Sequence, residues 1–396
     1  MTLRIGLAVV ALVLLGGLAA ACGGDDEDPP GVLIFISRKT GDYVIRMPNS
    51  GDKKPLELHN ILPWDASPVW SPDGSRIAFY GDRVFNLTNV DDNVDIYVMG
   101  ADGSGLTRLT DGEEADAFPV WSPDGQRIAF YRQDLGNGEI YTMAADGSDL
   151  RKLTDRPGID IPYDWSPDGE RLLFGSNAAG SFDIYAMDAD GGNIDRLTTS
   201  SRDEYSAVWS PDGSRIAFES EQDGNFDIFT MNVDGSRAAN MTVRPLADVS
   251  PEWAPDGLRL AFVSNRDANS EIYVLDTVFS EISPVTRASR DDLQPAWSPD
   301  GTRLAFISNR DFNPELYLSN ADGSGQKRLT SDVGWESAPA WSPDGALIAF
   351  SSFREGRRDV YVIHPDGTAT ARLTNDEAQP AAAGGDALTD SGAPLD

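Results

Sequence analysis

Residues 209–220 read Trp-Ser-Pro-Asp-Gly-Ser-Arg-Ile-Ala-Phe-Glu-Ser, and this stretch decides the fold because it recurs along the chain. The opening pentapeptide occurs seven times, with one copy reading Trp-Ala-Pro-Asp-Gly. Five consecutive spacings are 44 residues and the first is 51. A fixed period of this size indicates one structural unit copied in tandem. The motif tryptophans are Trp70, Trp121, Trp165, Trp209, Trp253, Trp297 and Trp341.

Each unit contains four short apolar segments separated by turn residues, in the order Pro-x-Trp, Ile-Ala-Phe, Ile-Tyr-x-Met and Arg-Leu-Thr. Runs rich in Ile, Val, Phe and Tyr between turn signals predict antiparallel strands. Ser-Pro-Asp-Gly suits a type I turn between the first two strands, and Asp-Gly suits a hairpin turn between the last two. A four-stranded unit of this length, repeated radially, predicts an all-β protein with a β-propeller fold.

The number of blades follows from the ends of the repeat. The phenylalanine of the second segment occurs eight times, once more than the tryptophan. The first unit, residues 32–58, lacks a Pro-x-Trp strand, and the segment around Glu377 matches the start of one. We therefore expect eight four-stranded blades, the first closed by residues 378–382, with seven blades as the alternative. The propeller is then predicted at 32–382 and a disordered tail at 383–396.

The repeat also indicates a family. Pro-x-Trp-Ser-Pro-Asp-Gly-x-Arg-Ile-Ala-Phe, followed by Asp-Ile-Tyr-x-Met and Leu-Thr, closely resembles the WD-like repeat of TolB-family β-propellers. The resemblance covers residues 32 to about 382. It implies a non-catalytic scaffold that binds a protein partner in the cell envelope.

The N-terminus has the layout of a secretory signal: Arg4, an apolar run over 5–21, and then Cys22, the single cysteine of the chain. Leu-Ala-Ala-Ala-Cys resembles the lipobox of bacterial lipoproteins, in which the cysteine is lipidated and becomes the mature N-terminus. We expect a signal peptide at 1–21 and an acidic tether at 22–31, with the protein lipid-anchored to the cell membrane outside the cytoplasm, on the periplasmic side or at the cell surface. An uncleaved membrane anchor is the alternative.

Composition excludes several classes of function. With 64 acidic and 32 basic residues, the net charge of -32 argues against nucleic acid and anionic lipid headgroups as partners. Only two histidines, His59 and His364, and no Gly-x-Ser-x-Gly sequence are present, so we expect no enzyme, no cofactor and no metal site. The prediction is a monomeric scaffold that binds an envelope protein. The alternative is a carbohydrate-binding or carbohydrate-cleaving propeller that uses carboxylates.

The two faces of such a ring differ. The turns after the first and third strands of each blade lie on one face, the turn face, and their sequences are uniform. The remaining connections lie on the opposite face, the loop face, and vary; variable loops on a rigid scaffold usually carry binding. An acid stands five residues before each motif tryptophan and at the matching place in the closing segment, which predicts an acidic ring on the loop face: Asp65, Asp116, Asp160, Glu204, Asp248, Asp292, Glu336 and Glu377.

Further loop-face residues are candidates for binding a partner. Four arginines follow the repeated phenylalanine by four positions, and either they pair with the acids or the acids remain free for a ligand. An insertion of seven residues adds apolar side chains, and two tryptophans lie outside the motif. Exposed aromatic residues often anchor partners, although these could pack under their own loops. The candidates are Arg83, Arg266, Arg310, Arg354, Phe85, Leu87, Trp64 and Trp335. On the turn face, Thr-Val-Phe-Ser-Glu-Ile at 277–282 replaces an Asp-Gly turn, as a contact site or simply a degenerate hairpin.

Overall fold

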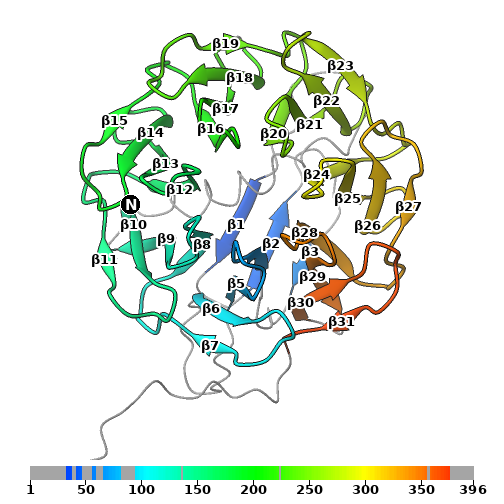
Figure 1. Ribbon diagram of the computed structural model, residues 1–396, viewed down its shortest axis with the longest axis horizontal. Helices are drawn as coiled ribbons and strands as arrows, with labels where there is room; N and C mark the ends of the chain where they lie inside the picture. Colours follow the sequence, from blue (N-terminus) through cyan, green and yellow to red (C-terminus); the bar gives the residue numbers. More distant parts are fainter. Residues whose placement is uncertain are drawn as a thin grey trace, which may run out of the picture.

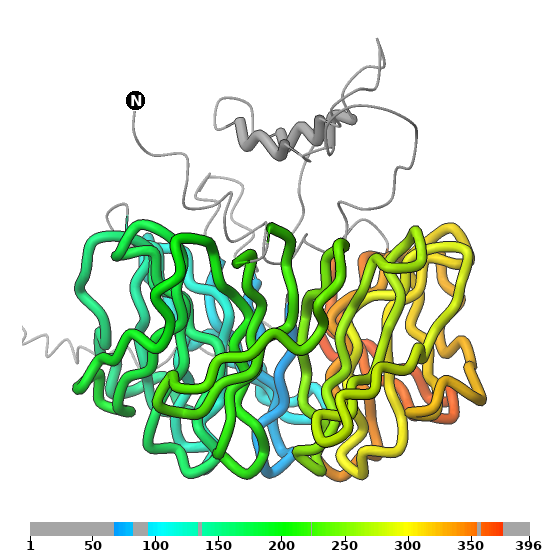
Figure 2. The backbone as a smooth tube through the Cα atoms, turned by 90° about the horizontal axis from the view of Figure 1, so that it is seen from above, coloured from blue at the N-terminus to red at the C-terminus, as the bar shows by residue number. Residues whose placement is uncertain are grey.

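Seven four-stranded antiparallel sheets make up the ring, and each is built from one contiguous segment of the chain. The computed structural model describes residues 33–37, 42–46, 56–58, 66–81, 94–134, 137–222, 224–354 and 357–374. The sheets are arranged as blades around a central axis, so the fold is a β-propeller (Figure 1). Figure 2 shows the same ring from its side.

Four successive strands form each blade, from the inner edge of the ring outward (Figure 1). Blades 1 to 3 are β4 (Ala66–Trp70), β5 (Arg76–Gly81), β6 (Asp95–Gly100), β7 (Thr107–Arg108); β8 (Asp116–Trp121), β9 (Arg127–Asp134), β10 (Asn137–Ala144), β11 (Arg151–Lys152); and β12 (Asp160–Trp165), β13 (Arg171–Ser176), β14 (Asp183–Asp188), β15 (Asp195–Arg196). Blades 4 and 5 are β16 (Glu204–Trp209), β17 (Arg215–Ser220), β18 (Asp227–Asn232), β19 (Ala239–Asn240); and β20 (Asp248–Trp253), β21 (Arg259–Ser264), β22 (Glu271–Asp276), β23 (Glu281–Pro284). Blades 6 and 7 are β24 (Asp292–Trp297), β25 (Arg303–Ser308), β26 (Glu315–Asn320), β27 (Lys327–Arg328); and β28 (Trp335–Trp341), β29 (Ile348–Arg354), β30 (Arg357–Ile363), β31 (Ala371–Arg372).

The ring closes between blades 7 and 1 through the contacts that also join other blades. The indole Nε1–H of Trp70 donates to the carbonyl of Ala340 at 3.0 Å, as that of Trp121 does to the carbonyl of Val69 at 3.2 Å. Ile77 of blade 1 shares a buried hydrophobic cluster with side chains of blade 7. The circle is therefore complete with seven blades.

The prediction of eight blades is wrong, and seven is the observed number. The eighth was expected from residues 32–58 joined to residues 378–382. The first of these segments contributes β1 (Leu33–Ser37), β2 (Asp42–Arg46) and β3 (Leu56–Leu58), which form a separate three-stranded sheet. Because blades 7 and 1 are already in contact, no gap remains between them for another blade. The predicted closing segment lies outside the described residues, as does the tail at 383–396.

The core of each blade is built around the phenylalanine of its second strand. These side chains are at most 1% exposed, and in all seven blades they lie against an aromatic residue of the third strand, with ring centroids 5.3 to 6.0 Å apart. A fully buried phenylalanine stabilises a fold by about 3–5 kcal/mol relative to alanine. The residues are Phe79, Phe130, Phe174, Phe218, Phe262, Phe306 and Phe350.

The Ser-Pro-Asp-Gly segments form the predicted turns. In the first copy, the amide of Gly74 donates to the carbonyl of Ser71 at 2.8 Å, and Gly74 has a φ of 70°, which favours glycine. The Asp73 carboxylate accepts from the Ser71 hydroxyl at 2.7 Å and the Ser75 amide at 3.0 Å. These hydrogen bonds, that from Ser71 first, hold the pKa of Asp73 at about 2. The aspartate therefore stabilises the turn as a carboxylate.

An arginine that follows this turn joins neighbouring blades. In four interfaces its guanidinium lies over the tryptophan of the next blade, 4.6 to 5.0 Å from a ring centroid. In three of them it also donates to the carbonyl of the next turn's glycine at 2.8 or 2.9 Å. Cation–π contact thus stabilises all four interfaces, and in three of them a charged hydrogen bond adds to it. The pairs are Arg76 with Trp121, Arg215 with Trp253, Arg259 with Trp297, and Arg303 with Trp341.

Candidate binding surface on the loop face

The acids predicted to form a ring lie at the start of the inner strands, at the interfaces between blades. The described members are at most 2% exposed. Asp65 and Glu377, the other two predicted members, lie outside the described residues. A carboxylate this deeply buried needs a cation or several hydrogen bonds, because burial of an unpaired charge is costly. The described members are Asp116, Asp160, Glu204, Asp248, Asp292 and Glu336.

Three of the candidate arginines are the partners of these acids. The guanidinium Nη2 lies 2.9 Å from the carboxylate in the pair Arg266–Asp248, 2.7 Å in Arg310–Asp292 and 2.9 Å in Arg354–Glu336. Each of the three guanidinium groups also lies over a tyrosine of the third strand, with centroid distances of 4.4 or 4.5 Å. Both partners of each pair are therefore engaged within the blade.

Two further arginines pair with ring acids, and the sequence spacing did not point to them. Arg132 binds Asp116 at 2.7 Å from a position two residues after the repeated phenylalanine, and Arg156 binds Asp160 at 3.0 Å from the connection between blades 2 and 3. Both also lie 4.8 Å from a tyrosine centroid. The guanidinium group therefore occupies an equivalent place in these two blades, although it comes from a different sequence position. Glu204 instead accepts a hydrogen bond from the Ser220 hydroxyl at 3.2 Å.

Burial dominates the electrostatics of these acids. It raises the pKa of Asp248 and Asp292 even though Arg266 and Arg310 lower it. Burial raises the pKa of Glu336 to about 7, against the opposing effect of Arg354. The described acids thus form a buried network of ion pairs and hydrogen bonds at the loop-face side of the interfaces.

A second set of buried acids lies at or near the start of the third strand of each blade. Glu315 is representative: it binds Arg328 at 2.6 Å and accepts from the Thr330 hydroxyl at 2.6 Å. We did not predict a role for these acids, although the recurring Asp-Ile-Tyr and Leu-Thr segments contain their signal. The set is Asp95, Glu139, Asp183, Asp227, Glu271, Glu315 and Asp359, none more than 2% exposed.

An exposed apolar patch lies on the loop face of blades 6 and 7. The side chains of Phe312, Val333, Trp335 and Phe353 are 82%, 98%, 57% and 39% exposed, and we call these residues the Trp335 patch. The rings of Trp335 and Phe353 face one another across β28 and β29, with centroids 6.4 Å apart. The guanidinium of Arg290 lies 4.2 Å from the Phe312 ring centroid.

Hydrogen bonds join the loops that carry this patch. The Asn313 side-chain amide donates to the carbonyls of Asp332 at 3.0 Å and Gly334 at 3.1 Å, and the amide of Glu336 donates to the carbonyl of Pro314 at 3.0 Å. Arg354 reaches Asp332 at 2.8 Å. The patch is therefore held as one surface across two blades.

Other candidates have different outcomes. Trp64, Arg83, Phe85, Leu87 and Cys22 lie outside the described residues. The replaced turn at 277–282 is the tip of the β22–β23 hairpin, where the side chains of Val278 and Phe279 are 61% and 79% exposed. Among the described side chains, no group of three histidine, cysteine or acidic residues could hold a metal ion. Within the same residues, no helix has the length and apolar character needed to cross a membrane.

Comparison with known proteins places the fold in a family. The family described as the TolB beta propeller domain matches residues 116–242, 204–294 and 248–386, which together exceed half of the chain. The Tol-Pal system protein TolB of Anaeromyxobacter dehalogenans is 48% identical over 54 residues, which are 13% of this chain and 11% of that protein. The matched segments span 11% to 39% of the lengths of the curated relatives.

Two solved structures show the likeness in three dimensions. TolB from Acinetobacter baumannii has a TM-score of 0.51 at 23% identity, covering 63% of this chain and 62% of that one. Oligogalacturonate lyase in complex with manganese has a TM-score of 0.61 at 18% identity, covering 85% of this chain and 96% of that one. At these identities the likeness shows the shared fold alone.

The blades and their two unlike faces define a β-propeller with an exposed aromatic patch on its loop face. The family match then makes the assignment specific: the chain belongs to the TolB β-propeller family. The predicted resemblance to TolB propellers is confirmed.

Proposed function

We propose that the protein is a non-catalytic scaffold, lipid-anchored outside the cytoplasm, that binds a protein partner of the cell envelope through its loop face. The Trp335 patch carries this proposal. Trp335 is 57% exposed, whereas the motif tryptophans Trp121 and Trp341 are 7% and 8% exposed. Clustered exposed aromatic side chains are typical anchors of protein interfaces, because a partner that covers them removes apolar surface from water. Membership of the TolB family supports an envelope role.

The proposed anchor rests on the sequence before the propeller. The segment Leu-Ala-Ala-Ala-Cys22 supports a signal peptide at 1–21, a lipidated cysteine, and a tether at 22–31 that keeps the propeller near the membrane. Metabolic labelling with a palmitate analogue tests this. Label on the wild-type chain and none on Cys22→Ser is expected, whereas equal labelling of both would contradict the anchor.

Photocrosslinking in intact cells tests the binding surface. A photoreactive residue at exposed Ser331, beside the patch, should give one specific adduct with an envelope protein. Replacing both Trp335 and Phe353 by serine should abolish that adduct because it removes the two neighbouring aromatic rings. The matched control is Phe279→Ser on the turn face, which should leave the adduct intact. An adduct that survives the double replacement would refute the proposed surface.

The carbohydrate alternative has less support from the described residues. The likeness to the lyase shows the fold, and the six described ring acids are buried in internal contacts. The matched segments cover 12% and 13% of the lengths of two peptidases, so no peptidase activity is proposed. A glycan array with wild-type protein and Glu336→Gln separates the alternatives. Hits lost in this variant would favour a carbohydrate ligand over a protein partner.

A further inference from the structure

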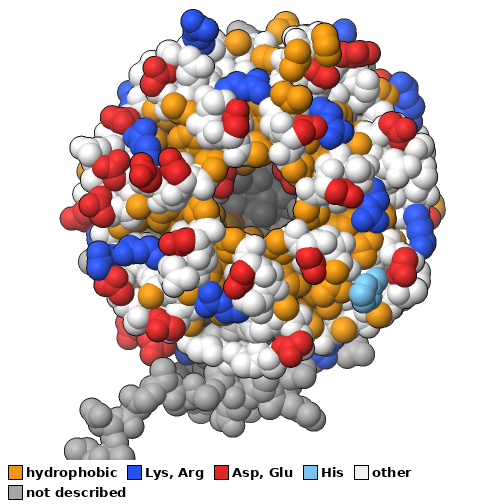
Figure 3. All heavy atoms as spheres, in the orientation of Figure 1, with side chains coloured by type: hydrophobic (Ala, Val, Ile, Leu, Met, Phe, Trp, Pro, Cys, Tyr) orange, Lys and Arg blue, Asp and Glu red, His pale blue; other side chains and the backbone are white. Residues whose placement is uncertain are grey.

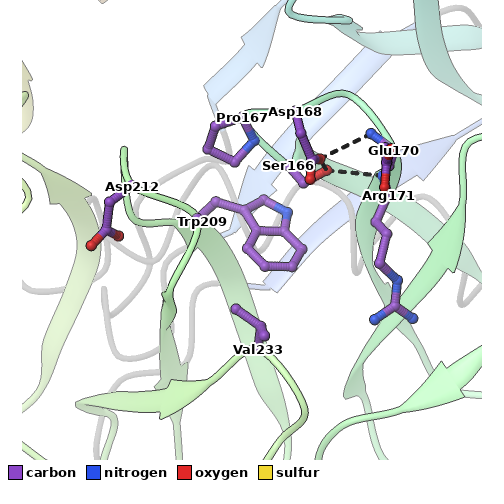
Figure 4. A pocket seen from close by; sticks show the side chains of 9 residues that line it. Ser166, Pro167, Asp168, Glu170, Arg171, Trp209, Asp212 and Val233 are labelled. Atoms are coloured by element: carbon purple, nitrogen blue, oxygen red, sulfur yellow. Dashed lines mark hydrogen bonds between the residues drawn. The ribbon is translucent and has the colours of Figure 1, made fainter.

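The interface between blades 3 and 4 lacks a contact that joins four other blade pairs. Arg171 stands where Arg76, Arg215, Arg259 and Arg303 stand in their blades, and Trp209 is the tryptophan that it should cover. Its Nη2 lies instead 2.6 Å from the Asp195 carboxylate. Figure 4 shows the Arg171 side chain pointing away from the indole of Trp209.

Asp195 explains the changed position of Arg171. It is the first residue of the short outer strand β15, and its counterparts in the other short outer strands are threonine, arginine, alanine or lysine. A carboxylate at this place attracts the guanidinium of its own blade. The interaction therefore draws Arg171 to the outer edge of blade 3 and away from blade 4.

A cavity of about 420 Å³ lies where the guanidinium would otherwise sit. Trp209 and Val233 contribute apolar surface, and Gly213 belongs to the turn whose counterparts accept a hydrogen bond from the stacked arginine. Asp168, Glu170 and Asp212 add carboxylates to the lining (Figure 4).

Two carboxylates of this lining, those of Asp168 and Asp212, have pKa values below the usual range of an aspartate. A hydrogen bond from the Ser210 hydroxyl, with others from Ser214, holds the pKa of Asp212 at about 2. The Ser166 hydroxyl lowers the pKa of Asp168 in the same way. The exposed carboxylates of Asp168 and Asp212 share this lining with Arg171, and their negative charge repels anionic ligands and attracts cations. Figure 3 shows acidic side chains spread over this face of the ring.

We propose that this cavity binds a guanidinium group and that its occupant is an arginine side chain of a partner protein. The four occupied interfaces show how such a group fits: it stacks on the indole in all four, and in three of them it also donates to the glycine carbonyl of the turn. A planar guanidinium makes both contacts, whereas the ammonium of lysine is compact and more strongly hydrated. The site lies on the turn face, so it is independent of the proposed loop-face function.

Titration with N-acetyl-arginine amide, followed by ¹⁹F NMR of 5-fluorotryptophan-labelled protein, tests the site. The Trp209 resonance, assigned with Trp209→Phe, should shift and saturate in the millimolar range. The neutral citrulline analogue should produce no shift. Asp195→Thr, which introduces the residue found in blade 1, should release Arg171 to cover Trp209 and weaken binding by at least about tenfold.

Two further variants complete the test. Arg215→Ala should open an equivalent site over Trp253, so that a second resonance shifts. Phe279→Ser changes another exposed residue of the turn face and should leave the affinity unchanged. The thermal midpoint of Asp195→Thr should equal or exceed that of the wild type, which shows that lost binding is not lost folding. Equal affinity of Asp195→Thr and wild type, or equal shifts with arginine and citrulline, would overturn the proposal.

Discussion

On the turn face, the arginine over a motif tryptophan comes from one repeated sequence position, whereas on the loop face the arginine beside an acid of the predicted ring comes from three. Turn-face cations are Arg76, Arg215, Arg259 and Arg303. Loop-face cations are Arg266, Arg310 and Arg354 at one position, with Arg132 and Arg156 at two others. Short uniform turns keep the register of the chain, so the same sequence position supplies the arginine in all four of these blades. Loops of different length do not keep this register, so the arginine that pairs with the acid stands at different sequence positions in different blades.

The largest expected difference in stability is between a loop-face and a turn-face substitution in blade 6. Arg310→Ala leaves the fully buried Asp292 carboxylate without its cation, so the free energy of unfolding should fall by about 3–5 kcal/mol at neutral pH. Arg303→Ala, on the turn face, removes a cation–π contact and should cost about 1 kcal/mol. Urea unfolding measures both. Equal losses would show that the loop-face ion pair contributes no more to the free energy of unfolding than the turn-face cation–π contact.

A second comparison stays on the turn face. Arg215→Ala removes both the stack on Trp253 and the hydrogen bond to Gly257, and should lower the free energy of unfolding by about 1–2 kcal/mol. Arg171→Ala removes an exposed pair with Asp195 and should cost about 0.5 kcal/mol or less. If Arg171→Ala costs as much as Arg215→Ala, the two interfaces are energetically alike.

The pH dependence of stability should differ between buried acids with a raised pKa and turn aspartates with a lowered pKa. Glu252 accepts a hydrogen bond from the Trp297 amide at 3.0 Å, and burial raises its pKa to about 7. An unfolded glutamate has a pKa of about 4.3, so the folded state keeps a proton that the unfolded state releases, and this contribution to stability is lost as pH rises from about 4 to 7. Glu252→Gln should therefore stabilise the protein by about 2–3 kcal/mol more at pH 8 than at pH 5. Thermal unfolding across this range would show the effect; an equal gain at both values would contradict it.

The opposite sign is expected for the turn aspartates. The pKa of Asp300, like that of Asp73, is held at about 2 by hydrogen bonds from its own turn. Their contribution is present above about pH 4 and is lost as pH falls towards 2.

The smallest effect is expected at the Trp335 patch. Trp335→Ala should change the free energy of unfolding by no more than about 0.5 kcal/mol, because an exposed side chain contributes little to the folded state. Chemical unfolding and far-UV circular dichroism check this. A large loss would mean that Trp335 supports its own loop, as in the alternative drawn from the sequence.

The repeat predicted much of the fold but not its closure. The eighth phenylalanine, Phe35, lies in a segment with strand character, and the sequence alone suggested that it completes another blade. The number of blades instead depends on the angle at which neighbouring blades pack. After seven blades the ring is closed, as the hydrogen bond from Trp70 of blade 1 to Ala340 of blade 7 shows. The spacing placed the acids at the start of the inner strands, yet it could not identify Arg132 and Arg156 as partners, because these occupy positions that no other blade uses.

The sequence by itself determined the strands, the turns, the blade and the family, because these depend on contacts within one short period of the chain. The tertiary structure alone decided the number of blades, the burial of the acids and the exposure of the Trp335 patch. It also decided that Arg171 turns to Asp195 and leaves a cavity at Trp209. These features depend on contacts between side chains that are distant in sequence, or on a choice between alternative partners for one side chain. The sequence of a single repeat unit does not contain this information.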